Sequence, residues 1–278
     1  MSSFENIEIE RVQKYWDARP CNIRHSPKPV GSKEYFDEVE ARKYFVESHI
    51  PPFAGFPTWK GKKVLEVGCG IGTDTVNFAR AGASVTAVDL SASSLSVARQ
   101  RVEVFGLSDR VRFFQGNCEE LSQLIPVEEY DLVYSFGVIH HTPHPKKAVA
   151  QIRRFMGQHS ELRLMVYSKA SYKLFWIMKE EGIWDMGRLD ELIARNSEAQ
   201  TGCPVTYTYT FDGVRSLLEG FEISELYKAH IFTWNIDAYK RYEYVKEEPW
   251  AAVSDTQLAE LERELGWHTL VRAKLPPQ

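Results

Sequence analysis

The stretch VLEVGCGIGTD, residues 64–74, decides the fold predicted for this chain. An apolar run typical of a buried strand leads into Gly68, Gly70 and Gly72, and a helical pattern follows. Glycines in such a turn let the backbone bend sharply and let a ligand approach without a Cβ in the way. The spacing is GxGxG, which differs from the dinucleotide GxGxxG pattern, and no GK[ST] of a phosphate loop follows. The turn therefore favours a nucleotide-like ligand without saying which one.

The sequence around this turn alternates short apolar runs with helical patterns. The runs predict seven strands, at residues 62–67, 84–89, 111–115, 130–135, 161–167, 221–227 and 267–275. Such alternation is typical of an α/β fold whose mostly parallel sheet carries helices on both faces.

The flanks of this core predict four segments. Residues 1–58 form an N-terminal helical lid, with helices at about 4–17 and 33–48, and residues 59–167 form a Rossmann-like core. Residues 168–220 interrupt the alternation and predict a substrate cap inserted after strand five. Residues 221–278 add the last two strands and a helix at about 254–265, which complete the core.

Composition narrows the classes of partner. The net charge is −4, which gives no general attraction to phosphate backbones, so we expect no nucleic-acid partner. The four cysteines are scattered, and this is typical of reduced thiols in a cytoplasmic protein. No signal-peptide core and no apolar run of membrane-spanning length stands in the sequence, so we expect no membrane span.

Polar residues follow the first three strands at the edge of the sheet where ligands bind. Asp89 ends the second strand, where a carboxylate can accept hydrogen bonds from both hydroxyls of a ribose. Glu66 stands before the first glycine and can accept from an amino-bearing ligand. Asn117 follows strand three and could contact an adenine edge, with the backbone N–H of Cys118 beside it; an ordinary turn is the alternative.

Four segments taken together resemble the class I S-adenosylmethionine-dependent methyltransferases. They are VLEVGCGIGTD, VTAVDLS, QGNCEEL and YDLVYSFGVIHHTPHP, in this order and spacing, and they fall within residues 60–167. The resemblance is greatest to the small-molecule branch that includes the ubiquinone- and menaquinone-biosynthesis type. It implies a seven-stranded sheet with a reversed last strand. It also implies S-adenosylmethionine as cofactor and S-adenosylhomocysteine as product.

The resemblance assigns roles to particular residues. Glu66 matches a position near the methionine end of the cofactor, Gly68 and Gly70 match positions that pass beneath it, and Asp89 matches the ribose-binding carboxylate. The family often has Asp where this chain has Asn117, whose amide can accept the same bond. Family members also often cover the cofactor with the segment that here holds Tyr15. The candidate cofactor-binding residues are Glu66, Gly68, Cys69, Gly70, Asp89, Leu90, Asn117, Cys118, Ser135 and Tyr15. Where the family has a KPGG-type turn, this chain has GQHSE, residues 157–161, for which we expect a hairpin-like turn away from the site.

The stretch GVIHHTPHP, residues 137–145, brings together His140, His141 and His144 after strand four. Adjacent histidines diverge and lack the i,i+4 spacing of helical metal ligands, so we expect no metal site. We expect one imidazole, that of His140, to hydrogen-bond the loop backbone. His141 either packs or takes a proton from the methyl acceptor, since an imidazole titrates near neutral pH. His140 and His141 are therefore the candidate catalytic residues.

The flanks offer candidate substrate contacts, for which cap packing or a solvated loop is the alternative. These contacts are Arg24, His25, Trp176, Tyr207 and Tyr209. We predict an enzyme that methylates oxygen or nitrogen of a small molecule with an anionic group, acting as a monomer or homodimer. Carbon methylation of a quinone-like ring is the nearest alternative, and a non-catalytic protein that binds S-adenosylmethionine is an alternative of another class.

Overall fold

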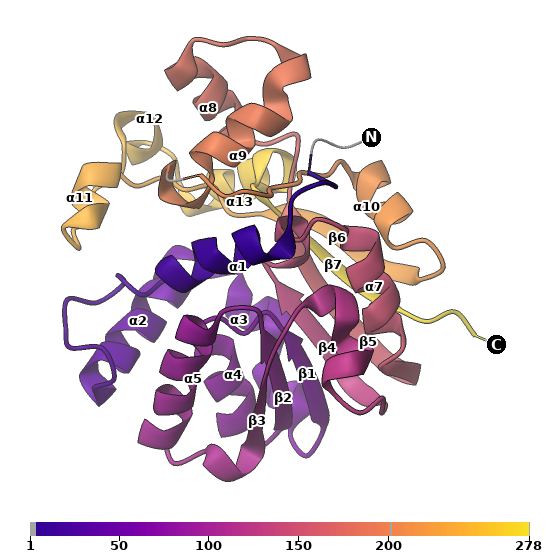
Figure 1. The fold of residues 1–278 in the computed structure, drawn as a ribbon. Helices are drawn as coiled ribbons and strands as arrows, with labels where there is room; N and C mark the ends of the chain where they lie inside the picture. Colours follow the sequence, from indigo (N-terminus) through magenta and orange to yellow (C-terminus); the bar gives the residue numbers. More distant parts are fainter. Residues whose placement is uncertain (1–3, 201, 278) are drawn as a thin grey trace.

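The computed structural model of the chain describes residues 4–200 and 202–277 and contains one seven-stranded sheet. The strand order is β3-β2-β1-β4-β5-β7-β6, and β7 alone runs against its neighbours in the described chain (Figure 1). The strands are β1 (Lys63–Val67), β2 (Ser84–Asp89), β3 (Val111–Gln115), β4 (Tyr130–Phe136), β5 (Met156–Tyr167), β6 (Glu222–Ala229) and β7 (His268–Lys274). The predicted α/β fold, with its reversed last strand, is confirmed.

Helices cover both faces of the sheet and enclose two apolar cores. One face carries α3 (Ile50–Ala54), α4 (Thr73–Arg80) and α5 (Ala92–Val104). The other carries α6 (Leu121–Leu124), α7 (Pro145–Arg153) and α10 (Phe211–Leu217). Helix α13 (Asp255–Leu265) packs on β6 and begins with a capping box between Ser254 and Gln257. Single 3₁₀ turns join these elements: η1 (Phe56–Trp59), η2 (Ser108–Arg110), η3 (Cys118–Glu120), η4 (Ile139–His141) and η5 (Met186–Arg188).

The remaining helices are α1 (Ile9–Ala18), α2 (Lys33–Val46), α8 (Tyr172–Glu181), α9 (Leu189–Gln200), α11 (Ile236–Lys240) and α12 (Glu248–Ala251). Of these, α2 packs beside α4 and α5, and the others lie beyond the carboxyl ends of the strands (Figure 1). Helices α1, α2, α8 and α9 lie in the segments for which the sequence predicts a lid and a cap. Helices α11 and α12 stand between β6 and β7, where the sequence predicts only completion of the core. In the described chain, no helix is both long and apolar enough to cross a bilayer.

The turn expected at residues 157–161 is not present as a separate hairpin. Strand β5 already begins at Met156, and its pairing with β4 shifts register between Tyr130 and Leu132. Ser160 holds the irregularity, because its Oγ accepts from the N–H of Gly157 and donates to the carbonyl of Tyr130. A β-bulge absorbs the extra residues here, so the expectation of a hairpin-like turn was wrong.

One fully buried arginine joins α2, α5 and the glycine turn. The Arg101 guanidinium donates to the carbonyls of Ile71 and Phe36 and to the hydroxyl of Thr73. Burial lowers its pKa to about 10, which still leaves it charged at neutral pH. The side chain therefore fixes the segment after the glycines against α2.

We predict that Arg101→Met lowers the free energy of unfolding by about 2–4 kcal/mol, because it leaves three buried acceptors without their donor. Urea unfolding of the purified chain measures this change. Arg110→Met, at an exposed arginine, serves as the control and is expected to change stability by no more than about 0.5 kcal/mol. Equal effects of the two substitutions would contradict the role given to Arg101.

Candidate functional site

A cavity of about 1080 Å³ opens at the carboxyl ends of β1, β2, β4 and β5. Strand β1 lies between β2 and β4, so the chain leaves the sheet centre in opposite directions at this point. Ligands of open α/β sheets bind at such a reversal. The volume suits a cofactor together with a medium-sized substrate. Helices α1, α2 and α8 and the segment between β6 and β7 also contribute to its lining.

The three glycines of the turn have different surroundings, so a Cβ would meet different neighbours at each of them. Gly68 has φ +82°, and a Cβ there would lie 2.1 Å from Val138 Cγ2. Gly72 has φ +76° and packs α4 against Ala98 of α5, which a Cβ would approach to 3.0 Å. Gly70 has φ +54°, and no heavy atom of the described chain lies within 4 Å of the place where its Cβ would be. Gly68 and Gly70 both line the cavity, and Gly70 in particular leaves it open to a ligand.

The Asp89 carboxylate holds the glycine turn to the end of β2 and faces the cavity. Its Oδ2 accepts from Gly70 N–H at 2.7 Å, and its Oδ1 accepts from Ser91 N–H at 2.8 Å. Burial raises its pKa to about 6, although these two hydrogen bonds act in the opposite direction. Each oxygen keeps a second lone pair that can accept from a ligand hydroxyl. The structure thus brings Gly70 and Asp89 together, as the sequence predicted.

The predicted adenine side also lines the cavity, with Leu90, Asn117 and Cys118. The Asn117 side chain accepts from Glu119 N–H and begins the short helical turn η3. Its Oδ1 therefore has one lone pair in use, while its amide N–H groups remain potential donors to a ligand. Burial raises the pKa of the Cys118 thiol to about 12, so this residue stays neutral.

Three predicted cofactor residues do not line the cavity. Glu66 is buried, and its Oε2 accepts from the Thr75 hydroxyl at 2.5 Å. Burial and the neighbouring Asp74 raise the pKa of Glu66 to about 8, which leaves it mostly neutral. Ser135 is buried, and its hydroxyl donates to the carbonyl of Val67. Cys69 is buried in one of the two apolar cores. All three sit beneath the cavity rather than on its surface.

The structure reverses the expected roles of the two adjacent histidines. His141, not His140, bonds a backbone carbonyl, and this carbonyl belongs to the cap segment: His141 Nδ1 lies 2.8 Å from the oxygen of Val205. His141 also lines the cavity. His140 is fully buried, with its ring centroid 3.9 Å from that of Tyr167, and neither ring nitrogen has a hydrogen-bond partner among residues 4–200 and 202–277. The expectation for His140 was wrong because that ring packs into the aromatic layer below the cavity.

Helix α1 covers the cavity and is fastened to the core. Tyr15 and Trp16 line the cavity, and the Trp16 ring lies 5.3 Å from that of His141. Asp17, next in the helix, accepts from the hydroxyl of Ser91 at 2.8 Å. The lid is therefore held at the first turn of α5, two residues from Asp89.

The loop after α1 reaches the cavity but offers less positive charge than expected. Arg24 and His25 line it. Burial lowers the pKa of His25 to about 3, with smaller contributions from Arg42 and Lys43, so this imidazole is neutral at pH 7. Its Nε2 lies 3.3 Å from the Tyr239 hydroxyl, a contact that joins the loop to α11. Contacts from this loop to an anion would therefore come from Arg24 and from Arg19, which also lines the cavity.

The aromatic residues of the cap separate into two groups. Trp176 of α8 lines the cavity. Tyr207 and Tyr209 lie side by side, as expected, but outside it; Tyr207 donates to the carbonyl of Pro143 and packs edge-on against Phe4. Tyr207 thus packs the cap against the N-terminal segment, whereas Tyr209 packs against the core of the sheet.

Other lining residues were not found from the sequence. Phe136 and Tyr167 end β4 and β5, and the rule that ligands bind at the carboxyl ends of strands could have identified them. Polar residues from α2 and from the ends of β6 and β7 gave no such signal, because only the tertiary fold places them at the cavity. They are Lys43, Glu47, His230 and His268.

Comparisons with known proteins agree with this geometry. Residues 64–158 match the methyltransferase domain family. A ubiquinone biosynthesis O-methyltransferase of Hahella chejuensis is 30% identical over 162 residues, which cover 55% of this chain and 59% of that protein. A ubiquinone biosynthesis O-methyltransferase of Actinobacillus pleuropneumoniae is 34% identical over 99 residues, which cover 34% of this chain and 42% of that protein. The chain thus spans less than two thirds of the curated relatives it matches.

Solved structures share the architecture over nearly the whole chain. The magnesium protoporphyrin IX methyltransferase of Synechocystis PCC 6803 with bound S-adenosylhomocysteine has a TM-score of 0.62 at 16% identity, covering 97% of this chain and 100% of its own. The putative methyltransferase of Haloferax volcanii, in complex with the activator Trm112, has a TM-score of 0.60 at 15% identity and covers 96% of this chain and 98% of its own. The predicted resemblance to class I S-adenosylmethionine-dependent methyltransferases thus agrees with the domain match over residues 64–158 and with the fold that the solved structures share.

We predict that Gly70→Ala weakens binding of S-adenosylhomocysteine much more than Gly106→Ala. Both glycines have left-handed φ, +54° and +66°, and neither Cβ would meet an atom within 4 Å in the described chain. Both substitutions therefore carry a similar backbone strain of about 1–2 kcal/mol, but only Gly70 lines the cavity. Calorimetric titration measures the affinities, and equal affinities of the two variants would contradict the assigned role of Gly70.

We also predict that affinity for S-adenosylhomocysteine falls as pH drops below about 6. Ligand hydroxyls donate to the ionised form of Asp89, whose pKa is about 6 in the empty site. The affinity for S-adenosylhomocysteine therefore reaches its full value above this pH. Well below it, the affinity decreases about tenfold per pH unit. The stability of the empty protein changes in the opposite sense for this group. Because its pKa is raised above the ordinary 3.8, its contribution to the free energy of unfolding increases as pH falls from 6 toward 3.8.

Calorimetry between about pH 5 and pH 8 tests this dependence, with Asp89→Asn as the control. The control is expected to bind weakly and with no comparable pH dependence. An identical profile in both proteins would show that another group titrates.

Proposed function

We propose that this chain is an S-adenosylmethionine-dependent methyltransferase that methylates oxygen or nitrogen of a small molecule. The observation that carries this proposal is the Asp89 carboxylate, which faces the cavity beside the open Gly70. The family match over residues 64–158 and the similarity to O-methyltransferases support the reaction type.

The residues present fit the cofactor. The missing Cβ of Gly70 leaves a cradle that a side chain would fill, and Asp89 offers acceptor lone pairs next to it. Asn117 and the Cys118 backbone would contact the adenine, while Tyr15 and Trp16 of α1 would cover the bound molecule. When bound, S-adenosylmethionine supplies a methyl group on a positively charged sulfur. Aromatic faces attract such a cation, which suits the lid formed by α1.

The acceptor would occupy the rest of the cavity, where the lining changes from glycines to aromatic rings. Phe136, Tyr167 and Trp176 supply apolar faces, and Arg24 stands at the rim of the cavity. A medium-sized molecule that carries an aromatic or apolar body and an anionic group would suit this lining. Positioning such a molecule in line with the methyl group and excluding water would supply much of the rate.

His141 is suited to accept the proton that the reaction releases. The acceptor lone pair forms a bond to the methyl carbon while the carbon–sulfur bond breaks and its electrons stay on sulfur. The acceptor O–H or N–H then releases a proton. His141 donates from Nδ1 to the Val205 carbonyl, which makes its Nε2 the basic nitrogen of the neutral ring. His141 lines the cavity, so an acceptor that reaches this buried nitrogen could pass it the proton.

Calorimetric titration of S-adenosylhomocysteine into the wild type, Asp89→Ala and His141→Ala tests the proposal. We expect Asp89→Ala to lose about 1–3 kcal/mol of binding free energy, roughly 5- to 150-fold in Kd, because a charge-assisted pair of bonds is removed. His141 lines the same cavity, on the side proposed for the acceptor. His141→Ala is therefore the matched control, and its affinity for S-adenosylhomocysteine is expected to change less than about threefold. No binding to a folded wild type would overturn the proposed function.

A further inference from the structure

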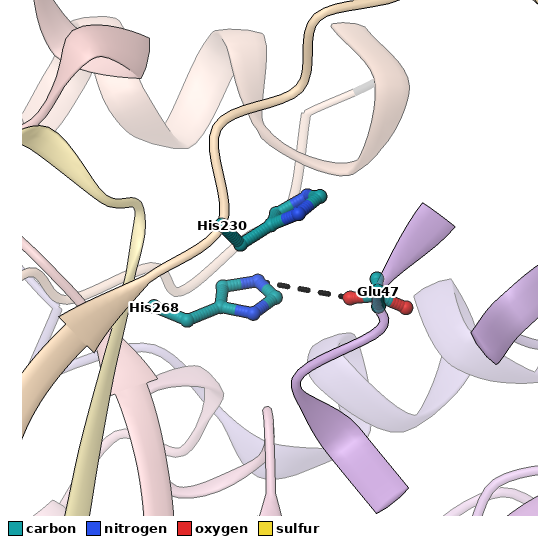
Figure 2. A group of neighbouring side chains, drawn as sticks. All are labelled: Glu47, His230 and His268. Carbon is teal, nitrogen blue, oxygen red and sulfur yellow. Dashed lines mark ion pairs between the residues drawn. The ribbon is translucent and has the colours of Figure 1, made fainter. Parts of the chain in front are cut away.

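Three polar side chains from distant parts of the chain meet on one wall of the cavity (Figure 2). Glu47 follows α2, His230 follows β6, and His268 begins β7. One carboxylate oxygen and one nitrogen of each ring all lie within 4.8 Å of one another. His268 and His230 are buried, and the Glu47 side chain is 20% exposed. Neither the proposed cofactor contacts nor the proton transfer to His141 uses this group.

The fold holds the two histidines at fixed places. His268 pairs with Tyr167 of β5 on one side and with Ala229 of β6 on the other. The next residue, His230, has φ +71°, a left-handed conformation that is uncommon for a side chain of this size. Its carbonyl accepts from Trp267 N–H at 2.8 Å, which fixes this strained turn beside His268. Such strain at a cavity wall points to function when the surrounding structure maintains it.

The hydrogen bond between His49 and His268 allows His268 to present a lone pair to a cation. His268 Nδ1 lies 2.9 Å from His49 Nε2, behind the cavity wall. When His268 donates this bond, its Nε2 presents a lone pair toward Glu47 Oε1, 3.8 Å away. Burial, together with the surrounding His230, His49 and His140, holds the pKa of His268 well below its usual range, so the ring is neutral. A neutral nitrogen and a carboxylate oxygen then face each other across a gap too wide for a hydrogen bond.

We propose that Glu47, His230 and His268 bind a divalent first-row transition-metal ion, such as Zn²⁺, on the wall of the cavity. Two imidazoles and one carboxylate are a ligand set that such ions use with open positions left for water or substrate. Ligand atoms around zinc lie about 3.4 Å apart, so the 3.8 Å between Glu47 and His268, and separations of up to 4.8 Å within the group, would close when the ion binds. His49 supplies the outer hydrogen bond that orients a metal-bound histidine.

The surrounding charges permit this ion. Lys43 also lines the cavity, but its ammonium is paired with Asp74 at 2.7 Å. Burial, with a smaller contribution from Lys173, lowers the pKa of His230 to about 4. With one carboxylate as the only charged ligand, a divalent ion leaves a net positive charge that faces the cavity.

This charge assigns a substrate class, an inference that rests on the proposed function. An acceptor hydroxyl or carboxylate oxygen can fill an open position on the ion. A bound hydroxyl releases its proton to water or to His141. The resulting oxygen forms the bond to the methyl carbon as the carbon–sulfur bond breaks and its electron pair stays on sulfur. The proposal revises the prediction of no metal site, which considered only His140, His141 and His144.

Titration of Co²⁺ into the full chain without an affinity tag tests the site. We expect one equivalent to bind with visible d–d absorption, and Zn²⁺ to displace it and bleach the colour, since zinc binds nitrogen and oxygen ligands more tightly than cobalt. Glu47→Gln and His268→Ala should weaken Co²⁺ binding by roughly 100-fold or more, and His49→Ala by roughly 10- to 100-fold. Two controls should leave the affinity for Co²⁺ unchanged: Glu34→Gln, at an exposed position in the first turn of α2, and His159→Ala, at an exposed histidine in β5.

Circular dichroism establishes that each variant is folded, and Glu47→Gln decides the matter if His268→Ala fails to fold. Absence of saturable Co²⁺ binding to the folded wild type overturns the proposal, as does binding that Glu47→Gln retains. Titration of S-adenosylhomocysteine into the same samples separates the two proposals. Cofactor binding without metal binding overturns the metal site alone, whereas metal binding without cofactor binding overturns the proposed function alone.

Discussion

The hydrogen bond from Gly70 N–H to the Asp89 carboxylate is the contact on which the site depends. It joins the turn after β1 to the end of β2, whose carbonyl of Val88 also accepts from the N–H groups of Gly68 and Cys69. The bond holds the turn in its left-handed conformation and keeps a buried carboxylate at the cavity surface. Burial disfavours the charge, whereas two backbone N–H donors favour it, and the balance places the pKa of Asp89 near 6.

The covering elements are fastened to the same corner of the molecule. Ser91 donates its backbone N–H to Asp89 and its hydroxyl to Asp17 of the lid helix. Arg101 joins the segment after the glycines to α2, the helix that Glu47 follows. The turn, the lid and the proposed metal site are therefore parts of one connected arrangement, and a change in the turn is expected to affect all three.

The sequence predicted what local pattern determines. Gly68, Gly70 and Asp89 adjoin apolar strands, and the parallel arrangement of those strands necessarily brings their carboxyl ends together. The pattern also predicted the seven strands, with errors only at their ends and at the β5 bulge. It assigned the wrong histidine to the backbone bond, because the sequence cannot show which of two adjacent rings packs against Tyr167.

What the sequence missed depends on contacts between distant segments. Glu47, His230 and His268 carry no motif, and they meet only because the fold brings the residue after α2 next to the end of β6 and the start of β7. The segment between β6 and β7 likewise looked like a simple connection, yet its residues Phe232, Trp234 and Tyr239 line the cavity. Tertiary packing alone gives these residues their position.

The most direct test of the account is a crystal structure of this chain with S-adenosylhomocysteine. We expect the ribose hydroxyls to lie within about 2.5–3.0 Å of the Asp89 oxygens. We also expect the adenine to lie beside Asn117 and the ligand to pass close to the backbone of Gly70. A molecule bound elsewhere in the cavity, or one whose ribose makes no contact with Asp89, would contradict the account.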